Sequence, residues 1–206
     1  MIPSLAFLLA ALALAVVPGP GLAYVVARTV AGGRGEGVAS SFGTAAGGMV
    51  HVVLSALGLS VVIATSPGLY ALIKYLGAAY LLYLGVRILL TRTSPDVAPE
   101  LAREGAGKAF RDGVVVEALN IKTAMFFIAF IPPFVSPAHP FALQFVILGC
   151  LCVAMNTCAD LVAVMAASHF LAAGEARASR ERVLAGVSGA VMISLGLWLA
   201  FSTVRG

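Results

Sequence analysis

The chain alternates between long apolar segments and short polar ones. A helix that crosses a bilayer needs about 20 mainly apolar residues, and six segments meet this requirement. We predict spans at Ile2–Ala27, Val38–Ala64, Leu69–Leu90, Val114–Val135, Phe141–Leu171 and Val183–Val204. What remains between the spans is too short for a soluble domain, so the pattern predicts an all-α integral membrane protein with six transmembrane helices.

Composition agrees with this interpretation. Hydrophobic residues make up 61% of the 206 residues and charged residues only 11%, whereas soluble domains carry roughly twice that charged fraction. A net charge of +4 is compatible with nucleic-acid binding, but most basic residues lie between the spans. We therefore expect contact with the lipid bilayer and none with nucleic acid. No Lys or Arg precedes Arg28, so the first segment lacks the basic region of a signal peptide and is interpreted as a mature span.

Lys and Arg are distributed unequally between the connections. The first, third and fifth connections hold 2, 4 and 3 of them, and the second and fourth hold none. Because cytoplasmic loops carry the excess of Lys and Arg, we predict that the odd connections face the cytoplasm. Both chain termini then lie outside, although Arg205 near the C-terminus does not fit this rule.

Three spans precede the central polar stretch and three follow it. An odd number of spans reverses the direction of the chain, so two related halves would form an inverted repeat, as in many transporters. We predict a first three-helix repeat at residues 1–90, a cytoplasmic connecting loop at 91–112 and a second three-helix repeat at 113–206. A faint similarity between residues 77–85 and 188–196 supports two inverted three-helix repeats.

A helix breaker lies within the first span. Pro18-Gly19-Pro20-Gly21 has apolar residues on both sides, so its two prolines fall at membrane depth. Proline removes a backbone N–H and clashes with the preceding turn, so the helix must break or kink there. In transporters, the half-helix after such a break directs its N–H groups and positive dipole end at an anion. A plain proline kink is the alternative.

Two ionisable residues lie deep in the predicted spans. Lys122 is eight residues inside the fourth span, roughly 12 Å from its start at 1.5 Å per residue. Asp160 lies in the fifth span, with Asn156 one turn before it on the same face. Buried charges are costly unless they are paired. We predict that Lys122 and Asp160 pair, either as a static ion pair or as a site that exchanges a proton or binds substrate.

His51 and Glu117 are weaker candidates for the same site. A lone membrane histidine is more often a hydrogen-bonded packing residue, and Glu117 lies near the cytoplasmic end of its span, three residues after Val114. Gly43-x-x-x-Gly47 allows close helix packing, either within one chain or between two copies in a homodimer.

Several chemistries have no support in the sequence. There is no Gly-x-x-x-x-Gly-Lys-Ser/Thr phosphate loop and no clustered set of metal ligands. We therefore expect no direct ATP use, no metal site, no cofactor and no enzymatic activity. Cys150, Cys152 and Cys158 share the fifth span, where thiols usually act as small apolar residues.

Taken together, these features resemble the LysE/RhtB family of small bacterial amino-acid exporters. The matching residues are Pro18-Gly-Pro-Gly21, the connection through Gly33, Arg34, Gly35 and Gly37 to Gly43, the string from Lys74 to Gly85, Asn120-x-Lys122 and Asp160. The resemblance implies six helices in two inverted halves in the bacterial inner membrane, and efflux of amino acids or similar metabolites driven by protons. The family usually has Asn-Pro-Lys in the fourth span, whereas Ile121 replaces the proline here. Asn120 could still open the helix by hydrogen-bonding its own backbone.

On this interpretation the substrate-binding residues are Pro18, Gly19, Pro20, Gly21, Asn120, Lys122, Asn156 and Asp160. The half-helix after Pro20 would hold a carboxylate, and Asp160 would meet the ammonium group or carry the coupling proton. Two other functions stay open. A membrane thiol relay needs a redox cysteine in each half, and all three cysteines lie in one span. A heavy-metal or ion exporter of similar architecture would need softer ligands.

Overall fold

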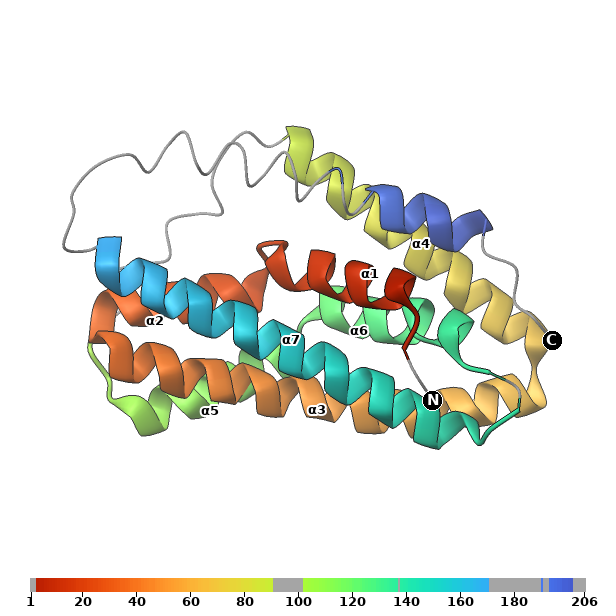
Figure 1. Cartoon of the computed structure of the whole chain (residues 1–206), viewed down its shortest axis with the longest axis horizontal. Helices are drawn as coiled ribbons and strands as arrows, with labels where there is room; N and C mark the ends of the chain where they lie inside the picture. Colours follow the sequence, from red (N-terminus) through yellow and green to blue (C-terminus); the bar gives the residue numbers. More distant parts are fainter. Residues whose placement is uncertain (1–2, 91–101, 137, 171–189, 191–192, 202–206) are drawn as a thin grey trace.

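The computed structural model describes residues 3–90, 102–136, 138–170, 190 and 193–201. Within these residues the regular structure is helical and contains no strand. Figure 1 shows an elongated bundle whose helices lie mostly side by side along its long axis. The predicted all-α class is therefore confirmed for the described part of the chain.

Seven α-helices and one 3₁₀ turn have defined bounds in the described part of the chain. They are α1 (Leu5–Val16), α2 (Pro20–Gly32), α3 (Arg34–Thr65), α4 (Pro67–Leu90), α5 (Ala106–Ala118), α6 (Ile121–Phe130), the 3₁₀ turn η1 (Pro132–Phe134) and α7 (Phe141–Phe170). Residues 193–201 are also helical.

Three helices are long and apolar enough to cross a membrane. They are Arg34–Leu59 within α3, Gly68–Arg87 within α4 and Phe141–His169 within α7. Two pairs of shorter helices, α1 with α2 and α5 with α6, meet the requirement only together. The described residues therefore provide three to five spans. More than half of the predicted sixth span, Val183–Val204, and half of the predicted loop at 91–112 lie outside the described residues, so six spans and an inverted repeat stay predictions. Residues 106–112, predicted as part of that loop, belong to α5.

The first predicted span breaks where its prolines lie. Helix α1 ends at Val16, α2 begins at Pro20, and the two helices bend by 47°. Pro20 is the first residue of α2, a position whose N–H makes no hydrogen bond within the helix, so proline is tolerated there. The predicted break is confirmed.

The fourth predicted span is also broken, although it contains no proline at the break. Helices α5 and α6 bend by 51° between Ala118 and Ile121. Asn120 caps α6, because its Oδ1 accepts a hydrogen bond from the N–H of Lys122 at 3.0 Å. An asparagine N-cap satisfies a free N–H at a helix start, so Asn120 stabilises the start of α6 without a proline at position 121.

The first predicted connection is shorter than expected. Residues 28–37 were predicted to link two spans, but only Gly33 interrupts the helices, with α2 continuing to Gly32 and α3 starting at Arg34. Gly33 has a φ of 80°, a left-handed conformation that favours glycine. Arg28 and Glu36 are therefore helical, and contacts from distant residues compensate their charges.

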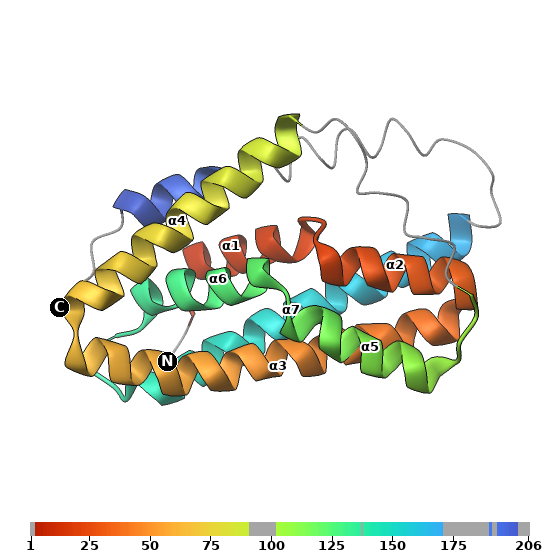
Figure 2. The ribbon, with the colours of Figure 1, turned by 180° about the vertical axis from the view of Figure 1, so that it is seen from behind.

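The two broken spans run in opposite directions along the bundle (Figures 1 and 2). The chain passes from α1 to α2 toward one end, and from α5 to α6 toward the other. Aromatic side chains fix α1 against α6, since the buried rings of Phe7 and Phe130 have centroids 6.4 Å apart, and Phe126 stacks on Phe130 at 4.4 Å. The two breaks lie close to each other, since the side chain of Lys122 reaches the carbonyl oxygen of Val17.

The glycine motif of α3 packs against α5 of the same chain. A Cβ added to Gly43 would overlap the carbonyl oxygen of Phe110. A Cβ on Gly47 would lie 2.6 Å from the carbonyl oxygen of Val114 and 2.8 Å from Cβ of Glu117. This glycine face is therefore used inside the chain rather than between two copies.

Candidate functional site

Lys122 of the second break completes the end of the first. It is the second residue of α6, and its Nζ donates a hydrogen bond to the carbonyl oxygen of Val17 at 3.1 Å. In a continuous helix this carbonyl would accept from Gly21, but α2 starts anew at Pro20. Gly19 leaves room for the amine, since a Cβ there would lie 2.7 Å from Nζ. Lys122 thus replaces a hydrogen bond that the break removes.

Glu117 takes the corresponding place at the start of α2. Its carboxylate accepts hydrogen bonds from Nδ2 of Asn120 at 3.0 Å and from Oγ1 of Thr123 at 2.6 Å. Oε2 lies so close to Gly21 that a Cβ on this glycine would overlap it. Glu117 is only 4% exposed. A carboxylate of the protein itself therefore occupies the N-terminal end of α2.

Helix dipoles account for this crossed arrangement. Cations are stabilised at the C-terminal end of a helix and anions at the N-terminal end. Within their own helices, Lys122 near the start of α6 and Glu117 near the end of α5 are placed unfavourably. Across the breaks both are favourable, because Lys122 meets the end of α1 and Glu117 the start of α2. Such contacts reach about 2 kcal/mol each when they are partly buried.

A small polar cavity lies beside these two groups. Its volume is about 30 Å³, which is room for about two water molecules and too little for an amino acid. The cavity is bounded by both breaks together with α3 and α7. Its polar lining consists of Thr44, Glu117, Asn120, Lys122, Thr123, Asn156, Thr157 and Asp160.

Asp160 of α7 is the third charged group of the cavity. It is 7% exposed, and its Oδ2 lies 2.9 Å from Oγ1 of Thr44 on α3. The single hydroxyl hydrogen of Thr44 is shared between this oxygen and the carbonyl oxygen of Ser41 at 2.8 Å. The other oxygen of Asp160, Oδ1, accepts no hydrogen bond from the part of the chain that the structure describes. Asn156, one turn earlier, lines the same cavity. These two side chains therefore present unused polar atoms to whatever enters.

The predicted ion pair between Lys122 and Asp160 is not formed. Both side chains line the cavity, but Lys122 binds the carbonyl of Val17 and Asp160 binds Thr44. The physical reason is the break in the first span, which leaves a buried carbonyl that needs a donor. The prediction of a static pair is wrong, whereas the placement of both residues at one cavity is what the structure shows.

His51 contacts the break in the second broken span. Its Nε2 lies 2.8 Å from the carbonyl oxygen of Glu117, and a carbonyl only accepts, so this nitrogen carries the hydrogen. His51 is buried and does not line the cavity. Its contact fits the packing role expected of a lone membrane histidine.

The structure brings most of the predicted site residues to the one cavity. Gly21, Asn120, Lys122, Asn156 and Asp160 line it, together with Glu117. The prolines and Gly19 do not line it but form the break and make space for Lys122.

Two threonines that hold its carboxylates were not predicted. Thr44 and Thr123 each donate to a carboxylate oxygen. Hydroxyls in apolar helices are common and carry little signal. The one available signal was the three-residue spacing from Glu117 to Asn120 to Thr123, which is typical of residues on one face of a helix and could have identified Thr123.

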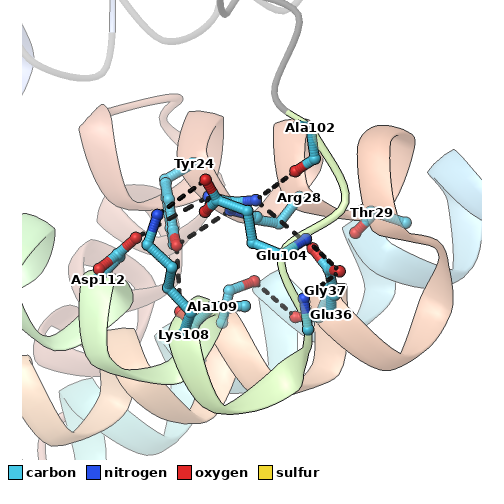
Figure 3. A network of polar contacts seen from close by, with 12 residues as sticks. Tyr24, Arg28, Thr29, Glu36, Gly37, Ala102, Glu104, Lys108, Ala109 and Asp112 are labelled. Carbon is cyan, nitrogen blue, oxygen red and sulfur yellow. Dashed lines mark hydrogen bonds and ion pairs between the residues drawn. The ribbon is translucent and has the colours of Figure 1, made fainter.

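A second polar cluster lies at the opposite end of α2 (Figure 3). Arg28, 2% exposed, donates to the hydroxyl of Tyr24 at 3.2 Å and to the carbonyl of Ala102 at 3.0 Å. It also pairs with the carboxylates of Glu36, at 3.5 Å, and Glu104. Several carboxylates therefore compensate the charge of one buried guanidinium.

The same cluster fixes the start of α5. Oε1 of Glu36 accepts from the N–H groups of Glu104 and Gly105 at 3.0 and 2.7 Å. Lys108 lies 2.7 Å from Glu104. Hydrogen bonds from Lys108 and Arg28 hold the pKa of the Glu104 carboxyl below its ordinary value. The residues just before α5 are thus bound to α2 and α3.

The described residues contain no group of three or more His, Cys, Asp or Glu side chains that could hold a metal ion. Cys150, Cys152 and Cys158 are free thiols on α7, and Cys152 lines the apolar part of the cavity.

A family model described as LysE type translocator matches residues 12–203. The match includes both breaks and every residue of the cavity. The chain belongs to the LysE translocator family. This confirms the resemblance seen in the sequence and makes the chain a multi-pass membrane translocator, not an enzyme.

Three relatives show how this translocator compares with other proteins. It is 30% identical over 201 residues to an uncharacterized membrane protein of Pseudomonas aeruginosa, and this alignment covers 91% of this chain and 90% of the relative. It is 30% identical to a homoserine/homoserine lactone efflux protein of Salmonella typhimurium over 70% of each chain. It is 31% identical to a leucine efflux protein of Salmonella choleraesuis over 65% of this chain and 64% of the relative. No solved structure matches the translocator.

Proposed function

We propose that this translocator exports amino acids or closely related small metabolites in exchange for protons. Relatives named as leucine and homoserine efflux proteins support the substrate class. The observation that carries the proposal is the buried carboxyl group of Asp160 in a polar cavity between two broken helices. Such a group can bind either a proton or a cationic group of a ligand.

Asp160 has the surroundings that exchange requires. Its hydrogen-bond partner among the described residues is the neutral hydroxyl of Thr44, and the other charged groups of the cavity are Lys122 and Glu117. A buried carboxylate without a cationic partner is costly. A proton or a substrate ammonium group at Oδ1 removes this cost, and one excludes the other. Alternating occupancy would couple proton entry to substrate exit.

Transport requires the helices around the cavity to move. The cavity of about 30 Å³ must open first to one side and then to the other, as in transporters that rock two helix bundles about a central site. The ends of α1, α2, α5 and α6 meet at the cavity. Movement of one broken span relative to the other would therefore change access to Asp160.

The proton gradient drives export outward, and the orientation of the chain decides which side of the cavity faces the cytoplasm. From the basic connections we infer that the Arg28 cluster lies on the cytoplasmic side of the bacterial inner membrane and that both termini lie outside. A periplasmic reporter enzyme fused to the C-terminus should therefore be active, and a cytoplasmic reporter at the same position inactive. The reverse result would overturn this orientation.

The function is tested with the full chain in proteoliposomes loaded with labelled leucine or homoserine. A pH gradient, acidic outside, should drive export. Asp160→Asn should abolish gradient-driven export, because the amide cannot take up the proton. Asp112→Asn is the matched control, since this carboxylate is 40% exposed and lies outside the cavity. Unaffected export in Asp160→Asn would remove Asp160 from the mechanism, and no export of either compound by the unaltered chain would overturn the proposed substrate class.

A further inference from the structure

The two anion-attracting features of the cavity already have partners from the protein. The N-terminal end of α2, which the sequence predicted to hold a substrate carboxylate, has the carboxylate of Glu117 against Gly21. That carboxylate is itself fixed by Asn120 and Thr123, so it cannot easily withdraw. A second carboxylate at the same helix end would meet its repulsion.

Lys122 is committed in a similar way. Its Nζ lies at the carbonyl oxygen of Val17, and the absence of a side chain on Gly19 makes room for it there. The amine therefore satisfies the negative end of α1. Displacing it toward a ligand would leave the carbonyl of Val17 without a donor in a buried place.

Apart from two N–H groups of Lys122, the side-chain polar groups that the cavity leaves unpaired among the described residues are anionic or neutral. Oδ1 of Asp160 accepts no hydrogen bond from the described residues, and Asn156 lies one helical turn away on the same wall. The charged groups of the cavity are one amine, Lys122, and two carboxyls, Glu117 and Asp160. When all three are ionised, the net charge is −1, and a cationic group neutralises it.

From this geometry we infer that the site recognises its substrate through a protonated primary amine at Asp160 and does not require a free carboxylate. Amino-acid amides, esters and lactones are then ligands, whereas N-acylated amino acids are not. This inference rests on the proposed function and narrows its substrate class. The competing arrangement uses the two remaining N–H groups of Lys122 to bind a substrate carboxylate, and it predicts that amides bind poorly.

Binding of six probes to the purified full-length protein separates these arrangements. The probes are L-leucine, L-leucinamide and N-acetyl-L-leucine, and L-homoserine, homoserine lactone and N-acetyl-L-homoserine. Affinities come from ligand-induced shifts of the thermal unfolding temperature in detergent, at a pH of about 6.5 so that the free amines are protonated. Measurements without a membrane avoid the collapse of a pH gradient by weak bases.

We expect the amide and lactone to bind within about tenfold of the parent amino acids. The N-acetyl compounds should bind at least about 100-fold more weakly, because a site built for a polar group rejects an analogue that lacks it. Asp160→Asn should weaken the binding of every probe with a free amine, and Asp112→Asn should weaken the binding of none. Circular dichroism of Asp160→Asn checks its fold, and Asp160→Glu, which keeps the charge, should restore part of the binding.

The outcomes distinguish the two proposals. Binding of the parent amino acids together with their N-acetyl forms, or loss of binding in the amide and lactone, would overturn the amine inference while the proposed function stands. Binding of none of the six compounds would overturn the proposed substrate class and this inference with it.

Discussion

Replacing Gly47 by alanine should force α3 and α5 apart and displace Glu117. A Cβ at this position would lie 2.6 Å from the carbonyl oxygen of Val114, 2.8 Å from Cβ of Glu117 and 3.0 Å from the nitrogen of Ala118. Two of these atoms belong to the backbone of α5 and cannot rotate away. To reach ordinary contacts of about 3.5 Å, the helices must separate by roughly 0.5–1 Å.

The cost can be isolated with a second glycine of the same helix. Overpacking costs about 1–3 kcal/mol, and replacing a helical glycine by alanine gains about 1 kcal/mol, so Gly47→Ala should lose between about 0 and 2 kcal/mol. A Cβ on Gly58 would meet nothing within 4 Å, so Gly58→Ala should show only the gain. The difference between the two variants is the clash itself, about 1–3 kcal/mol.

Unfolding of the purified protein by SDS, followed by circular dichroism, measures this difference. Because Glu117 moves with α5, Gly47→Ala should also slow export in proteoliposomes, whereas Gly58→Ala should leave it unchanged. Equal unfolding free energies for the two variants would show that α3 and α5 do not pack as closely as described, and the reasoning on Glu117 would fail with it.

Three further variants test separate contacts. Ile121→Pro should be neutral or stabilising by up to about 1 kcal/mol in the same SDS titration. Ile121 is the first residue of α6, and Asn120 before it has the extended backbone that a residue before proline prefers. The control, Ile128→Pro inside α6, should lose about 3 kcal/mol or more, and equal losses in the two variants would argue against the break. Thr123→Val should cost about 1–3 kcal/mol, because it leaves a buried carboxylate oxygen of Glu117 without its donor. The control is Thr157→Val, whose hydroxyl donates to a carbonyl within α7. A cost for Thr123→Val no larger than that of the control would contradict the contact with Glu117. Because the pKa of Glu104 is lowered from 4.5, its charge stabilises the fold above that pH and stops doing so as the pH falls through the lowered pKa. The difference in unfolding temperature between the natural chain and Glu104→Gln should therefore be present at neutral pH and disappear in acid. A difference that persists in acid would refute the charge contacts of Glu104.

The breaks were predictable because their causes are local. Pro18 and Pro20 interrupt a helix whatever surrounds them, and Asn120 caps the helix that follows it through its own side chain. Helix boundaries far from such residues were less well predicted. Arg28 was expected in a connection, but it is helical and its charge is compensated by partners such as Ala102 and Glu104. No pattern near Arg28 in the sequence predicts these partners.

Side-chain partners in the cavity were harder to predict than its members. Depth in a span identified Lys122 and Asp160 as buried, but depth does not give direction. The acceptor that Lys122 uses, the carbonyl of Val17, exists only because a different span is broken. Glu117 was underrated because it lies close to the start of its predicted span, whereas α5 in fact begins at Ala106 and carries Glu117 to its inner end.

The crossed contacts at the breaks bear on how the chain is made. When residues 1–90 have left the ribosome, the carbonyl of Val17 and the start of α2 still lack the partners that Lys122 and Glu117 later supply. We expect this early intermediate to tolerate water or lipid headgroups at its gap until the later helices insert. A fragment that stops before Glu117 should accordingly be degraded in cells, and supplying the remainder as a separate polypeptide should rescue it.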